Sequence, residues 1–236
     1  MRRRNINKKI DCSNYLTITV VNTATQISFT NKCEYCINGN ADWKTLNPSE
    51  SIIVPKNSFA CFKAKLIPNT DSNLENWGIG KFYISNDAIL SGNCMSMLFG
   101  DEAATYTSLQ GYNYAFANLF VQCNITQISK NFLPATTLSD GCYLNMFYDN
   151  KKLITAPELP AASLVYECYA EMFYGCNKLN YIKMLATDIS ARLCLKNWVF
   201  GVASTGTFVK NPKATWDVVG INGVPSGWTV KFDGEE

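Results

Sequence analysis

The sequence predicts an α+β fold: a small antiparallel β-sandwich, then a short α/β solenoid with a C-terminal cap. Short β-branched and aromatic runs separated by turn residues fill residues 13–90. From residue 94 onward, a similar sequence motif recurs at intervals of about 26 residues. The amino-acid composition changes again near residue 201, where Gly, Thr and Trp become frequent. We therefore divide the chain into a basic arm (1–12), the sandwich (13–90), the repeats (91–200) and the cap (201–236).

Composition places the chain among globular proteins. It has 236 residues, of which 47% are hydrophobic, and a net charge of +2. This charge balance predicts no nucleic-acid partner. There is no histidine, which removes the commonest general base and the commonest zinc ligand. We expect no enzymatic activity, no cofactor and no metal.

The N-terminal arm is basic and polar. Arg2, Arg3, Arg4, Lys8 and Lys9 provide its charge. No unbroken apolar stretch follows, so we expect neither a secretion signal nor insertion into a membrane, and the chain should stay in a reducing cytosol. The arm is either a disordered tail or an attachment segment that orders on an acidic partner surface.

Ten cysteines are present. In a reducing compartment we expect free, buried thiols rather than disulfides. Cys33 and Cys36 form the only close pair, and a zinc site would need a second pair. A packed structural pair is the better interpretation.

Six runs in the first part of the chain have the composition and alternation of strands. Turn signals such as Asn38-Gly39 and Asn47-Pro48 separate them. The runs are Tyr15–Val21, Gln26–Phe29, Glu34–Ile37, Ser51–Val54, Phe59–Leu66 and Lys81–Ser85.

Each repeat is predicted to hold one helix and one short strand. Leu138, Cys142 and Met146 are spaced four apart, as on one face of a helix, and Leu164, Cys168 and Met172 repeat that spacing. Stacked coils would bury one another's apolar sides. Two buried columns follow from the alignment, and Trp216 and Trp228 should cover the open end. The columns are Phe120, Phe147, Phe173 and Val199, and Cys142, Cys168 and Cys194.

The repeat text resembles the BspA-type leucine-rich-repeat surface proteins of gut Bacteroidales and of their crAss-like phages. The resemblance covers residues 94–232 and is carried by Ala156–Ala161, Cys168–Leu179, Gly206–Asn211 and Pro225–Val230. It implies adhesion or display on a virion, and it carries over no catalytic residue. Bacterial members are exported and anchored, whereas this chain has no signal in its sequence.

The expected function is therefore that of a phage virion-surface fibre or decoration protein. It would be made in the host cytoplasm, bound to other virion proteins, homo-oligomeric, and able to bind a host surface glycan or protein. A bacterial cell-surface adhesin is the alternative. An intracellular scaffold or a hydrolase is a third hypothesis.

Two sets of side chains are candidates for binding. On the expected strand face, Gln127, Thr155, Tyr181 and Lys183 form a predicted ligand strip. On the expected helices, four tyrosines either stack on a partner or pack between coils; they are Tyr143, Tyr148, Tyr169 and Tyr174. Five carboxylates could pair as in a glycosidase, but solvated charges are the ordinary expectation; they are Asp101, Glu102, Asp140, Glu158 and Glu171.

Overall fold

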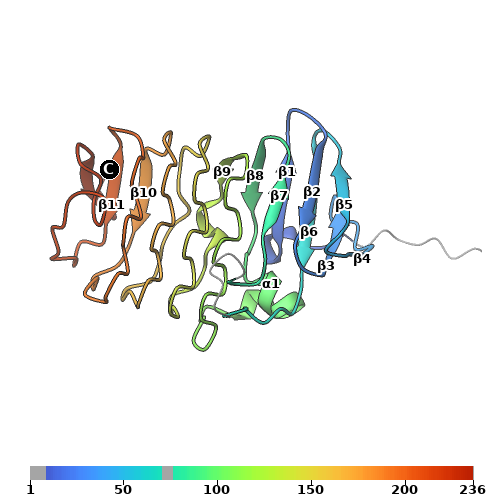
Figure 1. Cartoon of the computed structure of the whole chain (residues 1–236), viewed down its shortest axis with the longest axis horizontal. Helices are drawn as coiled ribbons and strands as arrows, with labels where there is room; N and C mark the ends of the chain where they lie inside the picture. Colours follow the sequence, from blue (N-terminus) through green and yellow to red (C-terminus); the bar gives the residue numbers. More distant parts are fainter. Residues whose placement is uncertain (1–8, 71–76, 236) are drawn as a thin grey trace, which may run out of the picture.

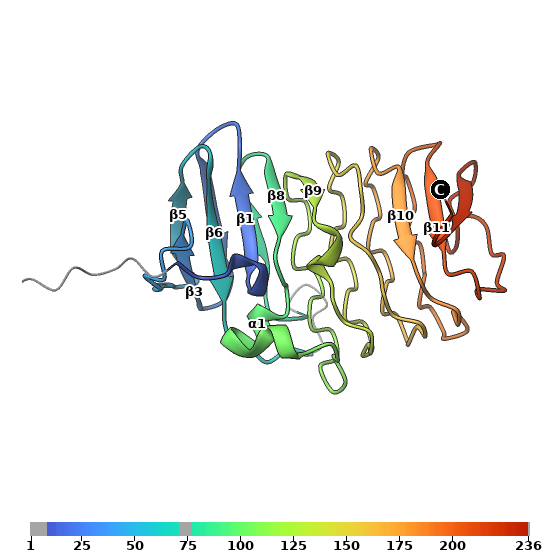
Figure 2. The same ribbon diagram turned by 180° about the vertical axis from the view of Figure 1, so that it is seen from behind.

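The computed structural model describes residues 9–70 and 77–235, and the molecule is elongated (Figure 1). Strands β4 and β5 lie at one end of the long axis, and β11 lies near the other (Figures 1 and 2). Of the expected attachment residues, Arg2, Arg3, Arg4 and Lys8 lie outside the described residues. Lys9 is exposed.

The described elements are mostly strands. The strands are β1 (Leu16–Val20), β2 (Thr25–Phe29), β3 (Cys33–Ile37), β4 (Lys44–Leu46), β5 (Ser51–Val54), β6 (Ser58–Lys63), β7 (Phe82–Ile84), β8 (Ala88–Ser91), β9 (Ile125–Ile128), β10 (Tyr181–Met184), β11 (Thr207–Lys210) and β12 (Thr229–Phe232). The helices are short: η1 (Cys12–Asn14), α1 (Ser96–Phe99), η3 (Gly100–Thr105) and η4 (Lys130–Phe132).

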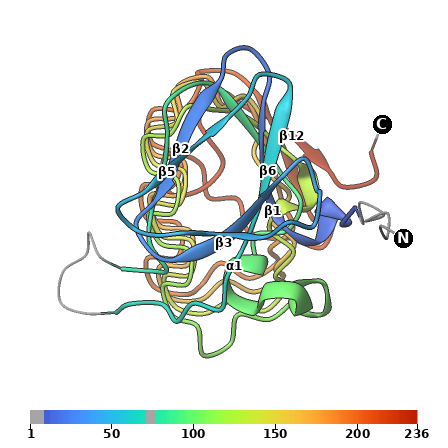
Figure 3. The ribbon, with the colours of Figure 1, turned by 90° about the vertical axis from the view of Figure 1, so that its right-hand side faces the viewer.

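Two sheets form the N-terminal part, and each of the six runs expected to be strands overlaps one. The first sheet has the order β4-β3-β6-β1-β8-β9, and the second has the order β5-β2-β7. Viewed along the long axis, β1 and β6 lie on one side and β2 and β5 on the other (Figure 3). Aromatic rings fill the space between: Phe82 stacks on Phe29 with ring centroids 4.5 Å apart and meets Phe62 edge-on at 5.2 Å.

The core does not stop at the expected boundary between residues 90 and 91. Strand β8, which the sequence did not predict, pairs antiparallel with β1 and parallel with β9 from the repeats. Phe82 also stacks on Phe120, with ring centroids 5.4 Å apart. One cluster of buried side chains therefore runs from the two sheets into the repeats.

The predicted α+β class with an α/β solenoid of helices is wrong, because the molecule is mostly β, with mixed and antiparallel sheets. The segments expected to be helical consist of consecutive turns. We call these the turn segments; they span residues 113–122, 140–149, 166–175 and 192–201.

The hydrogen bonds of a turn segment explain why it resembled a helix in sequence. In 140–149, alternate N–H groups donate to the carbonyl three residues earlier, as from Met146 to Tyr143 (3.2 Å). The others donate to the next coil, as from Phe147 to Met172 (3.0 Å). Every fourth residue is left-handed, with φ of +58° at Gly141 and +54° at Asn145. A four-residue period of turns places buried residues at i, i+4 and i+8, much as a helix would.

The predicted buried columns are confirmed although the helices are not. Phe120, Phe147 and Phe173 stack with centroids 5.9 and 5.7 Å apart and interplanar angles of 3° and 5°. Val199 is buried in the following coil. Cys142, Cys168 and Cys194 are buried free thiols.

The last part of the chain extends the stack. Strands β10, β11 and β12 pair in parallel in that order. Trp228 is buried, and its Nε1–H donates to the Ala203 carbonyl at 2.7 Å. Trp216 packs edge-on against Phe208 and donates to the Ala186 carbonyl at 2.9 Å. Both tryptophans therefore pack against the last part of the core.

Candidate functional site

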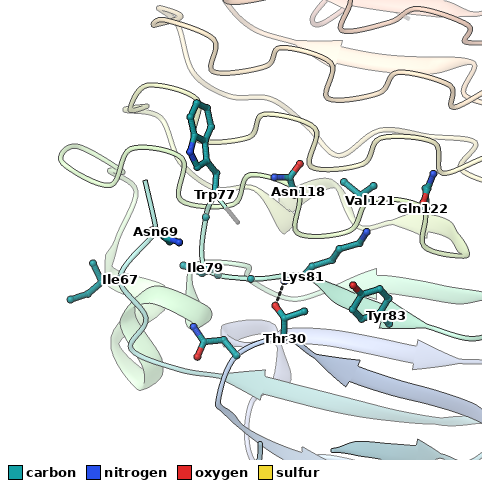
Figure 4. A pocket seen from close by; sticks show the side chains of 13 residues that line it. Thr30, Ile67, Asn69, Trp77, Ile79, Lys81, Tyr83, Asn118, Val121 and Gln122 are labelled. Atoms are coloured by element: carbon teal, nitrogen blue, oxygen red, sulfur yellow. Dashed lines mark hydrogen bonds between the residues drawn. The ribbon is translucent and has the colours of Figure 1, made fainter. Parts of the chain in front are cut away.

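A groove lies where the second N-terminal sheet meets the first turn segment (Figure 4). Its main cavity has a volume of about 670 Å³, and a neighbouring cavity of about 380 Å³ shares Tyr83, Val121 and Gln122 with it. We call the two together the junction groove. Side chains that line it include Thr30, Asn31, Ile67, Asn69, Trp77, Lys81, Tyr83, Asn118 and Gln122, with Gln26, Ser28 and Ser85 at the far end.

The floor of the groove is fixed by backbone hydrogen bonds between distant segments. Ile79 donates to the Ala115 carbonyl (3.2 Å), and Phe82 donates to the Leu119 carbonyl (2.9 Å). Gly78 has φ +93°, and a Cβ there would lie 2.7 Å from the Ala117 carbonyl oxygen. Only glycine fits this contact. The strand and the turn segment thus hold the lining residues in one arrangement.

Alternation along the strand directs two side chains into the groove. Phe82 and Ile84 point into the core, so Lys81 and Tyr83 point outward. Tyr83 is 53% exposed, and the Lys81 Nζ lies 5.2 Å from its ring centroid. The Lys81 N–H donates to Thr30 Oγ1 at 2.8 Å. This bond and a reciprocal one from Thr30 N–H to the Lys81 carbonyl (3.0 Å) fix the backbone beneath both side chains.

The groove offers ring faces together with amides and hydroxyls. Trp77 packs on Tyr114 with centroids 4.0 Å apart, at the end opposite Gln26. Amide side chains donate and accept hydrogen bonds at once, which matches the hydroxyl groups of a sugar. No carboxylate is among the described lining residues of either cavity.

The predicted ligand strip lies outside the junction groove. Thr155 bridges to Tyr181, and Tyr181 and Lys183 line a depression of about 330 Å³ beside β12. Gln127 lies on β9, which belongs to the sheet of β1, whereas the groove lies beside β7, in the sheet of β2.

Lys183 already has anionic partners in its depression. Its Nζ lies 2.8 Å from Asp233 Oδ1 and 3.3 Å from Glu158 Oε2. The hydrogen bond with Asp233, followed by that with Glu158, outweighs desolvation and raises the pKa of Lys183. The cation is therefore neutralised within the chain and is poorly suited to recognise a ligand.

The candidate carboxylates do not converge either. Asp101 binds Lys63 Nζ (2.8 Å) and accepts from Tyr15 Oη (2.7 Å), and the hydrogen bond from Lys63 is the main cause that lowers its pKa. Glu102 pairs with Lys65 at 3.6 Å, and Glu171 pairs with Lys196 at 3.5 Å. Asp101 lines a cavity of about 410 Å³ with Glu34 and Lys63. Each of these three candidate carboxylates is thus paired with a lysine.

The cysteines behave as core residues. All ten are free, and burial raises the pKa of Cys142 and of Cys176 to about 12. Cys36 lies opposite Cys61 in the register of β3 and β6. Across residues 9–70 and 77–235, no three His, Cys, Asp or Glu side chains are arranged to hold a metal.

The four tyrosines pack between coils. Tyr143 and Tyr169 are fully buried and stack with centroids 6.0 Å apart. Tyr148, Tyr174 and Phe200 form a second row near the surface, with centroids 4.7 Å apart at each step. Tyr174 lies between the other two rings, so both of its faces are covered.

Sequence reasoning missed the junction groove. The alternation of Lys81 and Tyr83 with Phe82 and Ile84 was a signal that could have found two of its residues. Asn118 and Gln122 could not be placed, because the turn segment that presents them was expected to be a helix.

Comparisons with protein-family models, curated proteins and solved structures find nothing similar to this chain. No helix in the described parts of the chain is long and apolar enough to cross a membrane.

Proposed function

We propose that this chain is a non-enzymatic adhesion protein that binds glycans in the junction groove and is displayed on a phage virion. The observation that carries the glycan assignment is the composition of the groove. It combines an exposed ring (Tyr83) and a second aromatic (Trp77) with amides and hydroxyls. Sugar recognition uses this combination, because apolar sugar faces stack on aromatic rings while the hydroxyls need donors and acceptors.

The virion setting has a different basis. It follows from the resemblance of the repeat text to surface proteins of Bacteroidales and their phages, and a bacterial cell-surface adhesin is its alternative. An open groove binds a single glycan weakly. Several copies of the protein on one particle would therefore raise the avidity. We therefore include a homo-oligomer, bound to other virion proteins, in the proposal.

Binding of the purified protein to an array of plant and mucin glycans tests the first part. We expect hits that are lost in Tyr83→Ala. Tyr181→Ala is the matched control, because Tyr181 is a partly exposed strand tyrosine in the other depression. If Tyr181→Ala lost glycan binding while Tyr83→Ala retained it, the binding site would instead be the predicted ligand strip. An array with no hits would overturn the glycan assignment.

Mass spectrometry of purified phage particles tests the second part. The virion proposal requires the protein in stoichiometric amounts with the capsid or tail proteins. Its absence from particles, with recovery from a bacterial envelope, would favour the cell-surface adhesin.

A further inference from the structure

We infer that the junction groove selects acidic glycans, and that Lys81 binds the anionic group of one sugar unit. This inference rests on the proposed function and adds the ligand class. Lys81 is the only charged residue among the described lining of the two cavities. A lone cation in a concave, largely neutral surface favours an anion over a neutral ligand.

The surroundings of Lys81 differ from those of Lys183 and Lys63. Lys183 contacts two carboxylates, and Lys63 contacts Asp101 at 2.8 Å and Glu34 at 3.9 Å. No carboxylate of the described residues lies within ion-pair distance of the Lys81 Nζ. Its described neighbour is instead the Tyr83 ring, 5.2 Å from Nζ to centroid. The ring holds the ammonium in place without neutralising it.

The same arrangement places the anion next to a stacking surface. Lys81 and Tyr83 leave the strand on the same side, two residues apart, and both line the main cavity. A sugar ring packed beside Tyr83 thus brings a ring carboxylate or sulfate to Nζ. Gln122, on the facing turn segment, lines the same cavity and can meet a neutral hydroxyl of that sugar or of the next one (Figure 4).

The groove, with cavities of about 670 and 380 Å³, has room for more than one sugar unit. The two cavities are continuous through Tyr83, Val121 and Gln122, and they extend from Trp77 to Gln26. The charge lies in the larger cavity and not at the far end. An extended acidic polysaccharide, with an anionic unit at Lys81 and neighbouring units along the groove, fits this distribution.

The test is calorimetric titration of the full chain with three oligosaccharides of equal length: oligogalacturonate, a sulfated galactan fragment and a neutral galactan fragment. We expect an acidic oligosaccharide to bind best, and the first two arms distinguish carboxylate from sulfate. Lys81→Gln should weaken acidic binding by about tenfold, the usual effect of losing a hydrogen bond to a charged group. Lys81→Arg should retain most of the affinity.

Lys178→Gln is the control, since Lys178 is exposed on a distant turn and the charge change is identical. It should leave every affinity unchanged. In Lys81→Gln, the affinity for the acidic oligosaccharides should also depend less on the salt concentration. Equal affinity for the neutral and acidic fragments, with Tyr83→Ala still abolishing both, would overturn the acidic preference and leave the proposed function standing. Absence of binding to all three and to the array would overturn both.

Discussion

The two N-terminal sheets and the repeats build one core by opposite routes. In the sheets, strands distant in sequence are neighbours, as where Leu16 pairs with Phe62 across β1 and β6. In the repeats, each turn segment bonds to the one about 26 residues further on, as where Tyr143 donates to the Cys168 carbonyl (3.0 Å). The sheets should therefore fold and unfold as a unit, whereas the repeats depend mainly on their nearest neighbours.

The two regions also place different demands on the backbone. A strand needs only extended residues, but each turn segment needs a left-handed residue at every fourth position. Gly, Asn and Asp tolerate that conformation, and most of these positions hold one of them. The repeats thus combine a costly backbone with a core of stacked, nearly identical rings. Burial of stacked rings in every coil can therefore offset the conformational cost of the left-handed residues. A single coil, with no neighbours to stack on, would not maintain that backbone.

The largest expected effect tests the nearest-neighbour character of the repeats. Phe147 stacks on rings on both sides, at 5.9 and 5.7 Å. We expect Phe147→Ala to lower the free energy of unfolding by about 3–5 kcal/mol. Hydrogen exchange should show the loss in the turn segments around it, with β1 and β6 still protected. Phe29→Ala in the sheets is the matched comparison and should reduce protection across both sheets. Uniform loss in both variants would refute the distinction.

A buried amide gives the next effect. Asn150 is fully buried, and its Nδ2 donates to the carbonyls of Phe120 (2.7 Å) and Phe147 (3.0 Å). At the equivalent positions, the thiols of Cys123 and Cys176 donate to a carbonyl of the preceding coil or strand. We expect Asn150→Ala to cost about 1–3 kcal/mol in urea denaturation, because the Phe120 carbonyl loses its shorter hydrogen bond and the Ile125 N–H loses its side-chain acceptor. Asn150→Cys should restore part of the loss. Equal stability of the two variants would argue against a donor role.

The smallest effect has the opposite sign. Leu193 is left-handed, with φ +59°, and its side chain is 39% exposed. Leu193→Gly should raise the thermal midpoint, with a gain of up to about 1 kcal/mol, because glycine avoids the steric cost of that backbone. Leu144→Gly is the control at a turn-segment position without positive φ, and it should destabilise. Destabilisation of similar size in both would show that side-chain packing outweighs the backbone at Leu193.

The sequence correctly predicted which side chains are buried. Leu16, Ile18 and Val20 alternate in sequence and are buried in β1, and the Phe and Cys columns are buried as the alignment implied. It did not predict the backbone of the repeats, because residues spaced four apart fit a helix and a row of four-residue turns equally well. The left-handed residues were the available signal: Asn145 and Asp149 recur in step with Gly141. The groove was missed for the same reason, since one wall of it is a turn segment.

The hydrogen bonds between successive coils have a further consequence for how such a molecule can change. Each coil presents backbone hydrogen-bond donors and acceptors to the coils on both sides of it. A further coil could therefore be inserted into the stack without changing how its neighbours bond. One inserted copy would lengthen the body by about 4.8 Å, the spacing of neighbouring strands. The groove, at the fixed end, would not be altered. Reach and recognition could therefore evolve separately.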